Sequence, residues 1–422
     1  MQLSSIRRFF RALGPGFVTG AADDDPSGIA TYSQTGAIFG LSQLWLAPFS
    51  YPFMVAVQEL CGRIGIVTGT GIAGVLRTHY SRSSVLIAVA LLLLANTINI
   101  GADLGAMAAG IQLLVPLPFP LLVSGITLFT VLLIVYVPYV QYARFLKYLT
   151  LSLLAYVGVA FSVQLDWAEV FRSFVPQIMW SHAYLFNIAA FLGTTISPYL
   201  FFWQADEEVE EEIARHELHE MSVGIPAFTP EDVQSMRIDT ALGMLFSQVI
   251  TAFIIIAVAS TLGVAGITHI TTAAEAAEAL QPVAGEMAAL LFTIGILGTG
   301  LLAVPVLAAS VGYAIAEALR WREGLNEKPG SAPGFYGSIV FVILAGLGVS
   351  LLPFGSIELL YWSAIINALL APPLMIMLYR IGNNAAVMGR YTNTRLSNAL
   401  LLSITLIMSG IGLLLIWTLI TP

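Results

Sequence analysis

The sequence predicts an all-α protein that crosses a membrane many times, and three observations indicate this class. The chain has 422 residues, of which 58% are hydrophobic and only 10% are charged, with a mean hydropathy of +0.86. Soluble domains carry about 25% charged residues, so this composition is typical of a polytopic membrane protein. Apolar stretches long enough to cross a bilayer recur along the chain, and two of them are interrupted at their middle by proline.

The apolar stretches predict eleven spans. Taken in order, they lie near 14–40, 43–66, 84–113, 117–139, 144–165, 184–205, 236–262, 284–318, 334–353, 357–380 and 396–420. The first ten divide into five and five, so the second five must be inverted relative to the first. We therefore expect one transmembrane domain over residues 1–422, with repeats at about 14–165 and 184–380 and an eleventh span at about 396–420.

The Lys and Arg residues predict the orientation, because cytoplasmic loops carry an excess of them. With the N-terminus in the cytoplasm, all but one of the 17 basic residues fall inside, and Arg172 alone falls outside. Those inside are Arg7, Arg8, Arg11, Arg63, Arg77, Arg82, Arg144, Lys147, Arg215, Arg237, Arg320, Arg322, Lys328, Arg380, Arg390 and Arg395. We expect the C-terminus outside and a location in the plasma membrane, most simply a bacterial inner membrane, because the loops are short.

Composition also excludes several classes of partner. The net charge is −8 and no basic patch occurs, which argues against nucleic acid. The one cysteine, Cys61, excludes a disulfide within the chain and a multi-cysteine metal cluster. We expect the lipid bilayer as surroundings, no obligate protein partner, no cofactor and no enzymatic activity.

The first span carries acids and a helix break at the same place. It reads GPGFVTGAADDDPSGIATYSQTGAIFG, and its middle holds Asp23, Asp24, Asp25, Pro26, Ser27 and Gly28. A carboxylate at mid-membrane costs several kcal/mol, and Pro followed by Ser-Gly interrupts the helix. Broken backbone at that depth is tolerated where it lines a cavity or is buried in protein, so this stretch predicts a cation site.

The sixth span repeats this pattern. It reads FLGTTISPYLFFWQ, with Thr194, Ser197 and Pro198 in its middle. Pro26 and Pro198 occupy corresponding places in spans 1 and 6. Paired broken helices in inverted repeats indicate a binding site at the membrane midplane, where half-helix ends and freed carbonyls can hold an ion.

The candidate ligands are all oxygen atoms, which suits Mg²⁺, Ca²⁺ or Mn²⁺ better than softer metals. They are the Asp25 carboxylate, the Ser27 and Ser197 hydroxyls, carbonyls near Ala22 and Thr194, and the side chains of Asp24 and Asn367. Other readings remain open. Asp25 could cap the second half-helix, Ser197 could bond to backbone, and Asp103 could bond to Thr97.

Two charged segments lie outside the predicted spans. The acidic run at 206–220 predicts a solvated amphipathic helix, favoured over a regulatory metal site at His216 and His219. The segment 262–283 predicts a short external helix whose acids are solvated.

Four features together resemble the Nramp family of divalent metal transporters, over essentially the whole chain. They are GPGF at 14–17, the Asp25-Pro26 pair, GIVTG at 65–69 and the broken sixth span, and Asp103 matches an aspartate of the family's third span. The resemblance implies the LeuT-type fold, with two inverted five-helix repeats and one further helix.

The departures from the family pattern suggest a different ion preference. The family's Asp-Pro-Gly-Asn is here Asp25 to Gly28, and its Met-Pro-His is Ser197-Pro198-Tyr199, so an amide and a thioether are lost. Other family positions hold Gln204 for a histidine, Ala364 for a glutamine, and Asn96 and Ala106 for acids. These changes resemble the Nramp-related magnesium transporter branch.

The resemblance and the residues together predict a secondary transporter that imports divalent cations by alternating access. We expect mainly Mg²⁺, with Mn²⁺ as a second substrate. Asp103, Asp23, Tyr199 and Gln204 would line or gate the route. Proton coupling should be weak or absent, because the histidines lie in loops or at a span edge. The alternatives are a proton-coupled Mn²⁺/Fe²⁺ symporter, a sodium-coupled solute carrier, a gated channel and an intramembrane aspartyl protease using Asp25 and Asp103.

Overall fold

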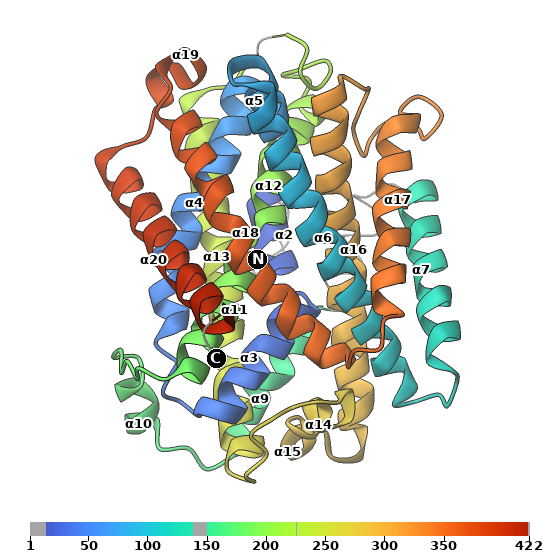
Figure 1. Ribbon diagram of the computed structural model, residues 1–422, viewed down its shortest axis with the longest axis vertical. Helices are drawn as coiled ribbons and strands as arrows, with labels where there is room; N and C mark the ends of the chain where they lie inside the picture. Colours follow the sequence, from blue (N-terminus) through green and yellow to red (C-terminus); the bar gives the residue numbers. More distant parts are fainter. Residues whose placement is uncertain (1–13, 138–149, 225, 421–422) are drawn as a thin grey trace, which may run out of the picture.

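The computed structural model describes residues 14–137, 150–224 and 226–420 (Figure 1). This part of the chain is a bundle of helices that run along the long axis of the molecule, and it contains no β-strand beyond one isolated bridge. The elements are α2 Pro15–Asp23, α3 Pro26–Phe39, α4 Leu46–Thr68, α5 Ile72–His79, α6 Arg82–Gln112, α7 Phe119–Tyr136, η1 Thr150–Leu153, α9 Leu154–Ser162, α10 Trp167–Arg172, α11 His182–Thr195, α12 Pro198–Ala214, α13 Pro230–Val258, η2 Ala259–Gly263, α14 Ala273–Glu278, α15 Gln281–Ala284, η3 Gly285–Met287, α16 Ala288–Leu319, α17 Pro333–Ser350, α18 Ser356–Gly382, α19 Ala385–Met388, η4 Gly389–Tyr391 and α20 Arg395–Ile420.

The predicted all-α, multi-pass class is confirmed. Among the described residues, eight helices are long and apolar enough to cross a membrane, and the bent pair α4 and α5 makes a ninth. The first predicted span, 14–40, is divided into the short helices α2 and α3. The fifth, 144–165, is described only from residue 150 onward, as α9 and the turn before it. The basic residues Arg7, Arg8, Arg11, Arg144 and Lys147, which the predicted orientation uses, lie outside the described part.

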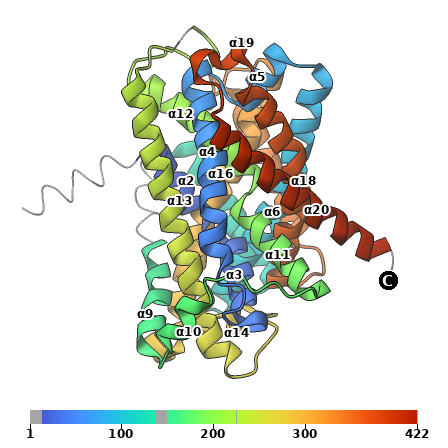
Figure 2. The ribbon, with the colours of Figure 1, turned by 90° about the vertical axis from the view of Figure 1, so that its left-hand side faces the viewer.

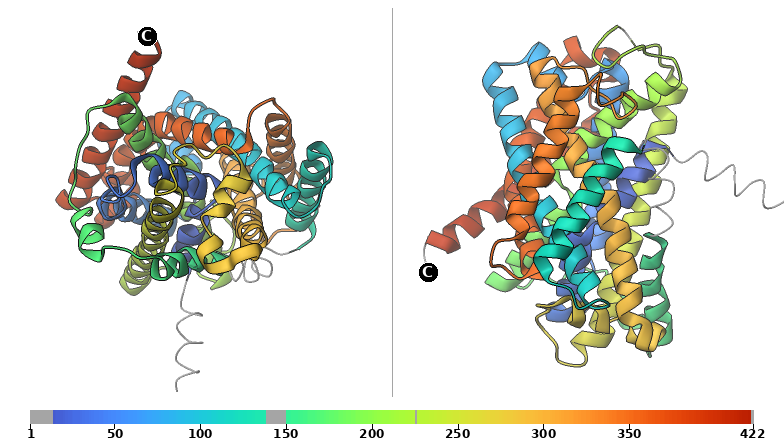
Figure 3. Two further views of the ribbon diagram at one scale, coloured as in Figure 1. Left: turned by 90° about the horizontal axis from the view of Figure 1, so that it is seen from below. Right: turned by 90° about the vertical axis from the view of Figure 1, so that its right-hand side faces the viewer.

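Connecting helices gather at the two ends of the molecule as the alternating topology requires. The segments α5 and α19 lie at one end, and α10, α14 and α15 lie at the other (Figure 1). Two of the latter, α14 and α15, form the short external helix expected in 262–283. The last helix, α20, slants across the outside of the bundle and projects from it (Figures 2 and 3).

Both predicted helix breaks are confirmed. Helix α2 ends at Asp23 and α3 begins at Pro26, with Asp25 as its N-cap residue. Helix α11 ends at Thr195 and α12 begins at Pro198. Proline is suited to the first turn of a helix because its missing N–H would have no partner there, so each proline ends one half-helix and starts the next.

Glycines let the two broken helices approach their neighbours backbone to backbone. A Cβ atom at Gly20 of α2 would overlap the backbone of Gly243 in α13. One at Gly193 of α11 would overlap the carbonyl oxygen of Ala364 in α18. Close crossings at small residues are the usual means of packing helices in membranes. They hold α2 and α11, and therefore both breaks, in the middle of the bundle.

The structure differs from the sequence analysis at three places outside the predicted spans. Helix α4 is followed, after a turn, by α5, which is bent from it by 63° and was not predicted. The expected solvated helix is wrong for the first part of the acidic segment, because α12 continues to Ala214 and its residues Asp206, Glu208, Glu210 and Glu212 are buried, while Glu220 is exposed. His216 and His219 do not share a helical face, since the helix ends before them and His216 has a positive φ of 63°.

Candidate functional site

The first break presents a buried carboxylate, that of Asp25. Its Oδ1 accepts hydrogen bonds from the Ser27 hydroxyl at 2.7 Å and from the Gly28 backbone N–H at 2.8 Å. Asp25 therefore caps α3, as one reading of the sequence allowed. Its second oxygen, Oδ2, points to α6 and accepts from the Asn99 amide at 3.1 Å. Because the cap uses only Oδ1, the second oxygen of Asp25 can interact with groups of other helices at the break.

Asn99 connects three helices, and sequence reasoning missed it. Its Nδ2 donates to Asp25 and, at 3.2 Å, to Asp103 Oδ2, while its Oδ1 accepts from Asn367 Nδ2 at 3.2 Å. The position of Asn99 four residues before Asp103 places both on one face of α6 and was the available signal. The alternative bond between Asp103 and Thr97 does not form, because the Thr97 hydroxyl donates to the Leu93 carbonyl of its own helix.

The second break meets the first directly. The Thr194 and Ser27 hydroxyls lie 3.2 Å apart, and the Tyr199 hydroxyl donates to the Ala22 carbonyl at 2.8 Å. Ser197, by contrast, lies between α11 and α12 and donates to the carbonyls of Gly193 and Thr194 at the end of α11, at 2.9 and 2.7 Å. The Ser197 hydroxyl therefore donates its proton to the backbone at the helix break, as one alternative in the sequence analysis allowed.

Asp23 and Asp24 share one hydroxyl donor. Ser247 of α13, which was not singled out from the sequence, lies 2.6 Å from Asp23 Oδ2 and 3.3 Å from Asp24 Oδ1. The other oxygen of each carboxylate is buried without a hydrogen-bond partner. A buried polar atom left unpaired costs about 1–3 kcal/mol, and more when it is charged. These two side chains therefore favour a bound cation or proton.

Gln204 does not join this group. Its Nε2 donates to Glu208 Oε1 at 2.8 Å, farther along α12. Gln204 lies seven residues after Ser197, about 10 Å along the helix axis. The residues that do come together are here called the central cluster: Ala22, Asp23, Asp24, Asp25, Ser27, Asn99, Asp103, Thr194, Tyr199, Ser247 and Asn367.

The central cluster is negative and closed. It holds four carboxylates, every side chain in it is buried, and none of the ion pairs in the described part of the chain reaches it. Carboxylates in a membrane interior need protons, metal ions or paired charges. No three acidic, histidine or cysteine side chains among the described residues stand close enough to hold a metal by themselves. Hydroxyl, amide and carbonyl oxygens would have to complete a cation site, and the breaks supply them.

A family model decides the relationship of this chain to known proteins. The model described as natural resistance-associated macrophage protein-like, or Nramp, matches residues 16–418. The chain belongs to the Nramp family. The match includes both helix breaks and every member of the central cluster.

Curated bacterial proteins resemble this Nramp chain at low identity. The divalent metal cation transporter MntH of Agrobacterium fabrum is 26% identical over 311 residues, which are 71% of this chain and 64% of that protein. The protein of the same name from Ralstonia nicotianae is 25% identical, over 97% of this chain and 91% of its own. The first of these matches therefore spans less than two thirds of the relative.

Solved structures share the fold of this Nramp chain. A manganese transporter mutant from Eremococcus coleocola superposes with a TM-score of 0.75 at 18% identity, over 95% of this chain and 85% of the other. Mhp1, a nucleobase-cation-symport-1 family transporter, gives a TM-score of 0.61 at 14% identity, over 95% and 91%. The chain has the predicted LeuT-type fold, with two inverted five-helix repeats, an eleventh span and broken helices 1 and 6.

Proposed function

We propose that this protein carries divalent metal cations across the membrane by alternating access, with Mg²⁺ as its main substrate and Mn²⁺ as a second. One observation carries the proposal: four buried carboxylates surround the meeting point of two broken helices, and no basic side chain among the described residues neutralises them. The names of the bacterial relatives, divalent metal cation transporters, agree with it.

The ion would be held by oxygen atoms from both breaks. Asp25 is the central ligand, because its Oδ2 faces the middle of the cluster. The remaining ligands are proposed among the groups that the sequence pointed to, with Asp103, Asp23 and Tyr199 along the route. They are the Ala22 and Thr194 carbonyls, the Ser27 and Ser197 hydroxyls, and the side chains of Asp24 and Asn367. For Ser197 the oxygen would bind as an acceptor, since its proton is already donated to backbone.

The ligand chemistry favours a hard ion. The central cluster contains no sulfur atom and no imidazole, whereas soft ligands of these kinds select the later transition metals. Mg²⁺ releases water reluctantly and is usually held through one or two carboxylates and retained waters. A cluster of carboxylates with neutral oxygens matches this behaviour.

We propose that proton coupling is weak or absent, with the carboxylates of the central cluster as the remaining candidate proton relays. Histidine chains are a common means of moving protons through a membrane protein, and the central cluster has none. The membrane potential alone would supply about 2.3 kcal/mol per charge per 100 mV, twice that for a divalent ion. Import can therefore run without protons.

The rival functions have weaker support. A proton-coupled Mn²⁺ or Fe²⁺ symporter agrees with the fold, but the cluster lacks the thioether and histidine of that type of site. An aspartyl protease needs two carboxylates that share a proton. Here the Asn99 amide donates to both Asp25 and Asp103, which opposes such sharing.

Uptake of Mg²⁺ and Mn²⁺ into proteoliposomes tests the proposal. Asp25→Asn keeps the size of the side chain and removes its charge, so saturable uptake should fall at least about tenfold, the effect of 1.4 kcal/mol. Glu278→Gln is the matched control, because this acid is exposed on α14, far along the chain from both breaks. Unchanged uptake in Asp25→Asn would contradict the proposal.

A further inference from the structure

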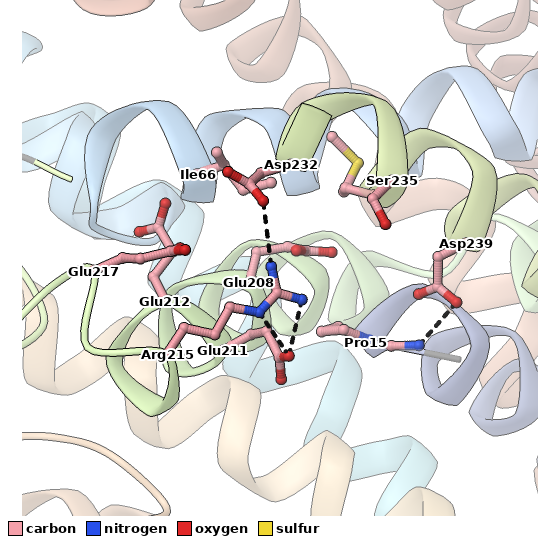
Figure 4. Close-up of a pocket in the computed structure, with 12 residues that line it drawn as sticks. Pro15, Ile66, Glu208, Glu211, Glu212, Arg215, Glu217, Asp232, Ser235 and Asp239 are labelled. Carbon is pink, nitrogen blue, oxygen red and sulfur yellow. Dashed lines mark hydrogen bonds and ion pairs between the residues drawn. The ribbon is translucent and has the colours of Figure 1, made fainter. Parts of the chain in front are cut away.

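A second group of acids lies at the far end of α12, away from the central cluster. It lines a pocket of about 40 Å³, bounded by the start of α2, the end of α4, the end of α12 and the start of α13 (Figure 4). Six carboxylates and one guanidinium line it: Glu208, Glu211, Glu212, Glu217, Asp232 and Asp239, with Arg215. Glu212 lies 15 residues after Ser197, about 22 Å along the helix axis, so this pocket is separate from the breaks.

Most of the pocket acids already have partners. Arg215 reaches Glu211 at 3.0 Å and Asp232 at 3.6 Å, as the dashed lines in Figure 4 show. Asp239 accepts the backbone N–H groups of Gly14 and Gly16, at 2.9 and 2.7 Å, and thereby caps α2. The guanidinium of Arg215 is therefore already paired with two acids, and the carboxylate of Asp239 already accepts hydrogen bonds from the start of α2.

Glu212 is the exception, and it points to a missing ligand. Its side chain is only 4% exposed, it lines the pocket, and neither carboxylate oxygen has a hydrogen-bond partner. Glu217 lies beside it in Figure 4, and the ion pairs of Arg215 go to Glu211 and Asp232 instead. A buried carboxylate without donors and close to other acids is unfavourable unless a cation or a proton is bound.

We propose that this pocket binds a hydrated divalent cation, at Glu212 and Glu217, as a second site distinct from the transport site. All the free ligands are carboxylate oxygens, which select hard cations. No three acids of the described chain converge tightly enough to hold a bare ion, so the ion keeps water molecules between itself and most of the carboxylates, as Mg²⁺ usually does. A pocket volume of about 40 Å³ leaves room for a few such water molecules.

The position of the site gives it a structural consequence. Glu212 belongs to the end of α12 and Glu217 to the segment that leads from α12 to α13, so a cation between them ties the end of α12 to this connection. Helix α12 also carries the second break at its other end. Occupancy of the pocket would therefore fix the far end of the half-helix that starts at the second break.

Binding of Mn²⁺ alone to the purified full-length protein, by equilibrium dialysis, separates the two sites. Asp25→Asn should keep one saturable site, and Asp25→Asn with Glu212→Gln should lose it. The control variant, Asp25→Asn with Glu278→Gln, should keep this saturable site. Glu217→Gln in the Asp25→Asn background should weaken the remaining site several-fold, which keeps the test valid if the Glu212 variant does not fold.

Two results would overturn this second site. One is loss of all binding in Asp25→Asn alone, and the other is unchanged binding after both Glu212→Gln and Glu217→Gln. If Asp25→Asn binds as much as the wild type while the Glu212 and Glu217 variants lose binding, the second site stands and the proposed transport site fails. The two proposals are thus tested separately.

Discussion

Asn99 gives one amide nitrogen to two carboxylates, Asp25 and Asp103, and its carbonyl oxygen to Asn367. Without this amide, two negative groups would face each other in a buried space with no donor between them. Groups that orient a metal-binding side chain typically change affinity by about 10- to 100-fold when they are removed. Asn99 is therefore a positioning residue for Asp25.

We predict that Asn99→Ala lowers saturable uptake about 10- to 100-fold, mainly through a raised KM, because Asp25 loses its orientation. Thr97→Val is the matched control, since the Thr97 hydroxyl bonds only to its own helix backbone. Uptake kinetics in proteoliposomes measure both variants. If Thr97→Val lowered uptake as much as Asn99→Ala, the loss would reflect a general disturbance of α6, and the positioning role of Asn99 would be contradicted.

Glu323 makes stability depend on pH at a place outside the membrane spans. It lies in the loop after α16, is 7% exposed, and burial together with the nearby Glu317 raises its pKa to about 10. The pKa of Glu323 is higher in the folded protein than its ordinary value of 4.5 in the unfolded chain. The stability that the proton contributes is therefore complete below pH 4.5 and is lost as the pH rises toward 10. Arg77, Glu210 and Glu220 also act on this group.

We therefore predict that the unfolding free energy of the wild type, and with it the melting temperature, falls as pH rises from 6 to 9, because the folded protein holds this proton and the unfolded chain does not. Glu323→Gln should flatten this dependence, because the amide resembles the protonated acid. Thermal melts in detergent at several pH values provide the measurement, with Glu278→Gln as control. A pH profile of Glu323→Gln that matches the wild type would contradict the assignment.

At the scale of elements, the two helix breaks could be predicted because proline leaves a local signature. Pro26 and Pro198 fix where each second half-helix starts, and both starts were placed correctly. The bend into α5 was missed, because its only signal is the short turn around Gly69, whose φ is +64°. The burial of Glu212 was also missed, since a run of acids ordinarily marks a solvated face and only the packing of α12 reverses that expectation.

The same limit applies to the central cluster. Asp25 and its neighbours on the break were predictable, because carboxylates beside a proline at mid-membrane are costly and are rarely found there unless they serve a site. Asn99 and Ser247 were not, since neutral polar residues occur in many spans and their role depends on which helices cross there. Helix crossings are set by small residues far apart in sequence, such as Gly193 and Ala364.

We predict that Gly193→Ala lowers the unfolding free energy by about 1–3 kcal/mol, because the new Cβ would overlap the Ala364 carbonyl and force α11 away from α18. Gly348→Ala in α17 is the control, since a Cβ there has open space around it. Thermal unfolding in detergent compares the two. A destabilisation as large in Gly348→Ala would mean that helix propensity, not packing, decides the effect.

At the scale of the whole molecule, the topology followed from hydropathy only in part. The first span is split into two short helices, and hydropathy alone would not identify it. The apolar stretches supplied the count of eleven, and the placement of the basic residues agreed with it. The connecting helices at opposite ends of the bundle agree with this alternation (Figure 1).

The predicted orientation can be tested with single cysteines in a Cys61→Ser background, since the natural cysteine is buried. His219→Cys, between α12 and α13, should be protected from an impermeant maleimide in intact cells. Gln177→Cys, between α10 and α11, should react. Both positions are exposed, so lysed cells provide the control in which both react. The reverse pattern would place the N-terminus outside.

The central claim is that the cluster at the two breaks is a hard-cation site that works without protons. Its most direct test is Mg²⁺ and Mn²⁺ uptake into proteoliposomes with the internal pH recorded, for the wild type and Asp25→Ala. We predict saturable Mg²⁺ uptake without acidification in the wild type, and loss of this uptake in Asp25→Ala. Mn²⁺ uptake with acidification and no Mg²⁺ uptake would contradict it and assign the protein to the proton-coupled transporters of its family.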